Sequence, residues 1–127
     1  MKKVSLVSRY LLGLIYFVFG LNGFLNFIPM PAEVPERAMK FSMAMMETGY
    51  FFPMIKGTEV VFGLLLLIGF ACPLALVVLA PVTINILLFH GVLTPGVENI
   101  VLPVVMVVMH LLAAINYWPR FKGLFSR

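Results

Sequence analysis

Four long apolar stretches alternate with short polar segments along the chain. They cover residues 4–27, 54–71, 73–90 and 99–117. An α-helix rises 1.5 Å per residue, so roughly 18–20 apolar residues cross a hydrocarbon core of ~30 Å. The pattern therefore predicts an all-α fold: an integral membrane four-helix bundle that occupies residues 1–127 as one transmembrane domain.

A short amphipathic helix is expected over residues 35–48, between the first two apolar stretches. Pro35 suits a first helical turn and Gly49 suits a helix end. Three methionines share one face and three charged residues share another, namely Met39, Met43, Met46 and Glu36, Lys40, Glu47. Such a helix either anchors the chain on the membrane surface or caps the bundle as a lid.

Two further breaks separate the later apolar stretches. The Cys72-Pro73 pair predicts a tight turn, and residues 91–96, which contain Thr94-Pro95-Gly96, predict another. Both connections are short, so consecutive helices are expected to run antiparallel.

Composition supports a membrane protein and excludes several other classes. Hydrophobic residues make up 62% of the chain and charged residues 11%, whereas a soluble domain carries about 25% charged residues. Cys72 is the only cysteine, which excludes an intramolecular disulfide and the paired cysteines of thiol oxidoreductases. The net charge of +4 comes from basic residues grouped at the chain ends rather than in a nucleic-acid-binding patch.

These basic residues predict the orientation of the protein. They precede or open the first apolar stretch and follow the last one: Lys2, Lys3, Arg9 and Arg120, Lys122, Arg127. Four crossings put both groups on one side, and the positive-inside rule makes that side cytoplasmic. Arg9, at the inner end of the first helix, is expected to extend to lipid phosphate.

Small residues in the first helix form a candidate packing seam. Gly13, Tyr16, Gly20, Gly23 and Phe27 follow the 3-4-3-4 spacing of a left-handed helix crossing. Helix association in lipid depends on close packing of small residues, so we expect this face to meet another helix.

Glu59 is the acidic residue within the predicted spans, about five residues, or roughly 7–8 Å, from the outer end of the second. A carboxylate at this depth faces inward, pairs with a cation or is protonated. Lys56 precedes it by three residues on the same face. One interpretation is an interfacial ion pair without further role, and the other is a contact to a ligand, a proton or a lipid head group.

Asn22 and Asn85 are expected at a similar depth in the first and third helices. With Glu59 they would form a polar layer below the outer surface. Hydrogen bonding between helices is the simpler explanation, and ligand binding is the alternative.

Two histidines suggest a haem or metal site, but His90 lies at the outer surface and His110 roughly 16 Å deeper. One iron would not bind both, so no metal site is assigned. His110 stays a candidate ligand contact because titratable groups near mid-bilayer often mark a functional pathway. The alternative is a hydrogen bond to a neighbouring helix, for example to Tyr16. No nucleophile–base arrangement is visible, and a catalytic residue is not assigned.

Short motifs in a fixed order resemble the DoxX-like family of small four-span membrane proteins. They are Arg9-x3-Gly13, then Gly20, then Glu59-x3-Gly63 with the apolar run 64–69, and a proline that opens the third span, Pro73. Relatives often carry a lysine after Gly20, where this chain has Asn22-Gly23. A role that needs a cation at this place is therefore not implied.

The resemblance implies a membrane role in the bacterial cytoplasmic (inner) membrane rather than a defined activity. Relatives are named from subunits of a thiosulfate:quinone oxidoreductase, others are associated with oxidative-stress membrane complexes, and distant eukaryotic relatives act as assembly chaperones. Two functions follow as hypotheses. The first is a non-catalytic subunit or assembly partner, with a protein partner or a homo-oligomer. The second is a quinone- or lipid-binding protein or redox subunit that uses the polar layer.

Overall fold

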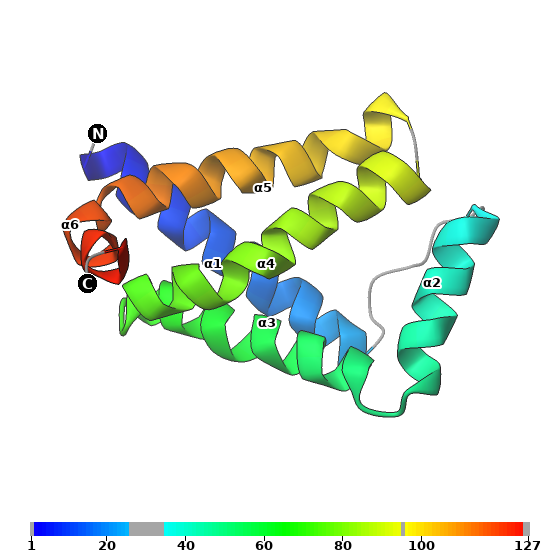
Figure 1. Ribbon diagram of the computed structural model, residues 1–127. Helices are drawn as coiled ribbons and strands as arrows, with labels where there is room; N and C mark the ends of the chain where they lie inside the picture. The colour runs from blue at the N-terminus through cyan, green and yellow to red at the C-terminus, as the bar shows by residue number, and fades with distance from the viewer. Residues whose placement is uncertain (1, 26–34, 95, 126–127) are drawn as a thin grey trace.

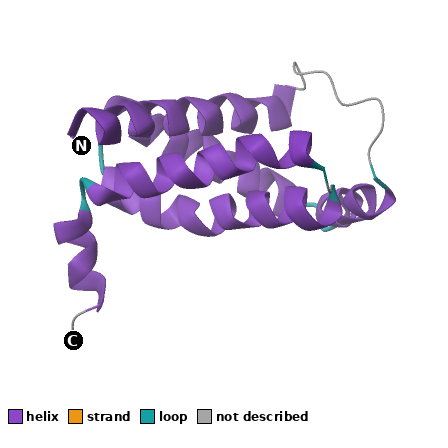
Figure 2. Ribbon diagram, turned by 90° about the horizontal axis from the view of Figure 1, so that it is seen from above, coloured by secondary structure: helices purple, strands orange, loops and turns teal. Residues whose placement is uncertain are grey.

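Four long helices lie side by side in the computed structural model, which describes residues 2–25, 35–94 and 96–125 (Figures 1 and 2). They are α1 (Lys2–Leu25), α3 (Phe51–Ile68), α4 (Cys72–Leu88) and α5 (Val97–Ile115). A π-helical turn, η1 (Phe89–Leu93), extends α4, and α6 (Trp118–Lys122) with η2 (Gly123–Phe125) closes the chain. Consecutive long helices alternate in direction, so both ends of the chain lie at the same end of the bundle (Figure 1).

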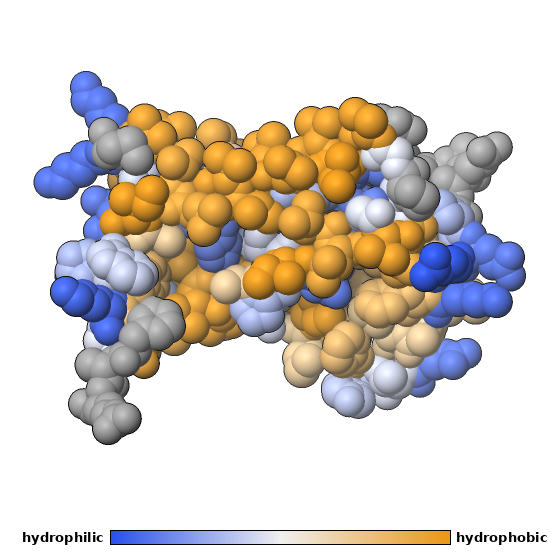
Figure 3. Space-filling model, turned by 45° about the horizontal axis from the view of Figure 1, so that its top comes forward, coloured by the Kyte–Doolittle hydropathy of each residue, from blue (hydrophilic) through white to orange (hydrophobic). Residues whose placement is uncertain are grey.

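Three of these helices are long and apolar enough to cross a membrane: α1, α3, and α4 together with η1. The apolar part of α5 covers Asn99–Ile115 and is shorter. On the face seen in Figure 3, hydrophobic side chains cover most of the middle of the molecule, and hydrophilic side chains gather at its two ends. The fold is therefore an all-α bundle with a lipid-facing exterior, and the predicted fold class is confirmed.

The closest helix contact joins α1 to α3 through glycines. A Cβ atom built on Gly13 would lie 2.9 Å from the Gly63 carbonyl oxygen, and one on Gly63 would lie 2.8 Å from the Phe17 backbone nitrogen. Gly20 and Gly23 likewise leave no room for a side chain against Val60 and Lys56. The predicted seam is confirmed for its described residues, and its partner is α3; Phe27 lies outside them.

The connection between α3 and α4 differs from the predicted turn at Cys72-Pro73. Gly69 ends α3 in the left-handed conformation (φ 78°), and its N–H donates to the Leu65 carbonyl. Ala71 also has a positive φ, 51°, and Cys72 and Pro73 already belong to the first turn of α4. A proline is well tolerated there because first-turn N–H groups have no helical partner. The turn predicted over residues 91–96 begins later too, because Gly91 to Leu93 continue as π-helix.

The amphipathic helix α2 (Glu36–Glu47) lies across the end of the bundle opposite the termini (Figure 1). Ala38 is buried, and the Phe41 ring packs against Phe89 of η1 with centroids 5.6 Å apart. The predicted methionine face, Met39, Met43 and Met46, is exposed. One face of α2 therefore covers the bundle, while these three methionines are exposed on the helix.

Candidate functional site

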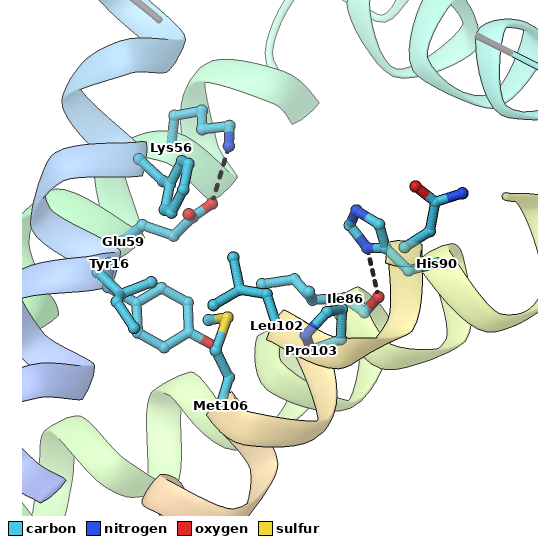
Figure 4. A pocket seen from close by; sticks show the side chains of 11 residues that line it. Tyr16, Lys56, Glu59, Ile86, His90, Leu102, Pro103 and Met106 are labelled. Atoms are coloured by element: carbon cyan, nitrogen blue, oxygen red, sulfur yellow. Dashed lines mark hydrogen bonds and ion pairs between the residues drawn. The ribbon is translucent and has the colours of Figure 1, made fainter. Parts of the chain in front are cut away.

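A cavity of about 390 Å³ opens among the four long helices, near the end covered by α2. Every long helix contributes to its wall, which is mostly apolar (Figure 4). The side chains that matter chemically are Tyr16 from α1, Lys56 and Glu59 from α3, His90 from η1, and Asn99 and Met106 from α5.

Glu59 supplies the acidic side chain of this cavity and is almost fully buried, with 3% of its surface exposed. Its Oε2 lies 3.4 Å from Lys56 Nζ, so the predicted i,i+3 ion pair is confirmed. Lys56 owes its position to Gly23: a Cβ atom there would lie 2.4 Å from Lys56 Cγ. The missing side chain on α1 thus lets Lys56 lie flat between the helices and reach back to Glu59.

His90 enters the cavity wall because η1 changes the helical register after Leu88. Its Nδ1 lies 3.0 Å from the Ile86 carbonyl oxygen, and its other ring nitrogen points away from this bond (Figure 4). Inserted π-helical turns often occur at functional sites because they redirect side chains in this way. Sequence reasoning placed His90 at the outer surface and did not include it in the site.

A second cavity of about 210 Å³ lies under α2 and shares Lys56, Glu59 and His90 with the first. Phe41, Ser42 and Met45 of α2 form part of its wall. Glu59 therefore stands between the two cavities, and α2 covers one of them.

A chain of hydrogen bonds links three helices deeper in the bundle. The Tyr16 hydroxyl bonds to the Thr83 hydroxyl, and Thr83 Oγ1 lies 3.0 Å from His110 Nδ1. His110 Nε2 lies 2.8 Å from the Leu76 carbonyl oxygen. His110 is thus connected to Tyr16, as one interpretation of the sequence proposed, but through Thr83, a residue that the sequence did not single out.

The predicted polar layer is only partly assembled. Asn85 is exposed and lines the second cavity with Glu59 and Lys56, whereas Asn22 lines neither cavity. His110 also lies outside both cavities. It borders an apolar groove of about 900 Å³ beside α6. The structure brings Glu59, Lys56 and Asn85 together and adds Tyr16 and His90.

Arg9 differs from the expectation that it reaches lipid phosphate. Its side chain folds into the protein at the end of the bundle away from the cavities, with 9% of its surface exposed. Nη1 lies 3.2 Å from the Tyr117 hydroxyl, and the guanidinium stacks 4.4 Å from the centroid of the Tyr10 ring. The guanidinium also packs beside Gly69, where an added Cβ atom would lie 3.4 Å from Nη2, an ordinary van der Waals distance. Local packing therefore holds Arg9 inside.

Among the residues that the structure describes, no three His, Cys, Asp or Glu side chains meet in a way that would hold a metal ion. What the site offers is an apolar cavity with a few convergent polar groups. This is the usual composition of a small-molecule site.

The fold and its lipid-facing surface define a small integral membrane protein with an internal cavity. Residues 4–92 match the DoxX family model, which covers more than half of the chain and describes small membrane proteins. The chain belongs to the DoxX family, as the motifs around Arg9 and Glu59 indicated. No curated protein and no solved structure matches it.

Proposed function

We propose that the protein binds a lipophilic molecule with a polar head group, such as a quinone or a lipid, in the cavity beside Glu59. The observation that carries this proposal is a nearly fully buried carboxylate whose cavity is otherwise mostly apolar. A buried charge is costly in hydrocarbon, so such residues commonly serve a function. Lys56 reduces that cost but occupies only one carboxylate oxygen.

The site would be reached from the half of the membrane next to α2. We propose that all four long helices cross the bilayer, with both chain ends in the cytoplasm of a bacterial cell. The basic residues at those ends and the antiparallel order of the helices support this orientation. The head group of the ligand would then lie near the outer surface, beneath α2.

The experiment is a titration of the purified protein with a short-chain quinone, with its quinol and with phosphatidylethanolamine, each followed by native mass spectrometry. Glu59→Gln keeps the size of the side chain but removes its charge. We expect its affinity for the quinol and for the aminolipid, whose O–H or N–H can donate to the carboxylate, to fall about ten-fold, the effect of losing one charge-assisted hydrogen bond. Glu47→Gln, an exposed acid of α2, is the control and should bind like the wild type. Equal affinity of all three proteins would exclude the Glu59 carboxylate as a contact.

A second proposed function is that of a non-catalytic subunit or assembly partner of a membrane complex. It is supported by the composition of the described chain, which consists almost entirely of apolar helices and has no separate soluble domain. Affinity isolation in mild detergent should then recover a partner in fixed stoichiometry. Repeated recovery of the protein alone would argue against this function.

A further inference from the structure

The cavity presents hydrogen-bond acceptors from two elements, Glu59 of α3 and His90 of η1. Glu59 contributes a carboxylate, which only accepts hydrogen bonds when ionised. Because Oε2 faces Lys56 at 3.4 Å, Oε1 is left to accept from another group. This deeply buried carboxylate is thus an acceptor.

His90 adds a second acceptor. A carbonyl oxygen cannot donate, so the bond between Nδ1 and the Ile86 carbonyl places a proton on Nδ1. In a neutral imidazole the other nitrogen, Nε2, then carries a lone pair. This nitrogen points into the cavity (Figure 4).

Tyr16 lines the cavity but adds no hydrogen-bond donor to it, by the same reasoning. The Leu76 carbonyl fixes the proton of His110 on Nε2, so in the neutral ring Nδ1 accepts from the Thr83 hydroxyl. Thr83 has then used its proton and accepts from Tyr16. The Tyr16 side chain is fully buried and its hydroxyl donates to Thr83, so Tyr16 offers no donor to a ligand in the cavity.

The donors of the cavity belong to Lys56 and Asn99. The Lys56 ammonium pairs with Glu59, and it lies 5.7 Å from the centroid of the Phe52 ring. Asn99 has an amide that can donate or accept. Two acceptors, Glu59 Oε1 on α3 and His90 Nε2 on η1, therefore face one cavity, and the Lys56 ammonium beside them already pairs with Glu59 Oε2.

We infer that the head group bound beside Glu59 is a hydrogen-bond donor: a hydroxyl or amine N–H on a lipophilic molecule. A phenol, a quinol or an alkylamine meets this requirement, whereas a quinone, an ether or an ester offers acceptors alone. The inference rests on the proposed ligand-binding function and specifies the chemistry of its ligand.

The test compares two probes that differ in one hydrogen-bond donor, para-hexylphenol and para-hexylanisole. Binding to the wild-type protein in detergent is measured for each by isothermal titration. We expect the phenol to bind about ten-fold more tightly, because its O–H donates to an otherwise unpaired acceptor in the cavity. In Glu59→Gln and His90→Phe this preference should shrink. The wild-type comparison does not depend on whether either variant folds.

A quinol with its quinone, and an alkylamine with the alkane of equal length, then identify the source of the donor. Preference for the quinol alone indicates a phenolic head group, and preference for the amine indicates an aminolipid. Equal binding of phenol and anisole, or tighter binding of the anisole, would overturn the inference while leaving the proposed binding function intact. No binding of any probe would overturn both.

Discussion

At the scale of single residues, Thr83 is the side chain on which the deep hydrogen bonds depend. It joins Tyr16 of α1 to His110 of α5 from its position on α4, and all three side chains are buried. Replacement by an apolar group of equal shape would leave two buried polar groups without their partner, which costs more than the bond itself contributes.

We predict that Thr83→Val lowers the free energy of unfolding by about 1–2 kcal/mol. Thermal unfolding in detergent measures the change. Thr58→Val is the matched control, because the Thr58 hydroxyl bonds to the Met54 carbonyl of its own helix and joins no second helix. If both variants unfold at the same temperature, the chain from Tyr16 to His110 does not stabilise the bundle.

The sequence could predict some of these residues and not others. Glu59 and Lys56 were identified because charges are rare in apolar helices and because a spacing of three places them on one face. Thr83 gave no such signal, since a threonine in a membrane helix commonly bonds to its own backbone. His90 and Tyr16 became part of the site through helix rotation and the π-helical turn, which the spacing of residues does not reveal.

At the scale of helices, the contact between α1 and α3 determines where Lys56 and Glu59 lie. A Cβ atom added to Gly63 would lie 3.0 Å from the Gly13 carbonyl oxygen and 2.8 Å from the Phe17 backbone nitrogen. Backbone atoms cannot move aside as a flexible side chain can. An added methyl group must therefore push the two helices apart.

We predict that Gly63→Ala destabilises the protein by about 1–3 kcal/mol and weakens ligand binding, because overpacking shifts α3 and with it Glu59. Gly57→Ala, on the same helix, is the control: nothing lies within 4 Å of its added Cβ atom. It should stay within about 1 kcal/mol of the wild type. The prediction fails if the two variants unfold alike.

The apolar pattern predicted most helices to within a few residues, and the Pro35 and Gly49 signals located α2. It could not predict the turn after α3, because Gly69 and Ala71 adopt left-handed conformations that leave Cys72 and Pro73 inside α4. The partner of the glycine seam also had to come from the structure. Small residues indicate that a helix face packs closely against another helix, but they do not identify that other helix.

At the scale of the whole molecule, α2 and the chain ends lie at opposite ends of the bundle (Figure 1). Four crossings would place them on opposite sides of the membrane. Labelling of single cysteines tests this arrangement, because the chain has one native cysteine, Cys72, which is buried and can be replaced by alanine.

In a Cys72→Ala background, we predict that Glu47→Cys reacts with a membrane-impermeant maleimide in intact cells. Lys122→Cys should react only after the membrane is permeabilised. Both positions are exposed, so a lack of reaction reports the side of the membrane rather than burial. Labelling of the two variants from the same side would contradict four crossings.

The most direct test of the central claim, a ligand held beside Glu59, is native mass spectrometry of the protein extracted from its own membrane. We predict that the wild type and Glu47→Gln carry a small lipophilic adduct and that Glu59→Gln carries much less of it. An adduct of equal occupancy in all three proteins, or none in the wild type, would contradict the account.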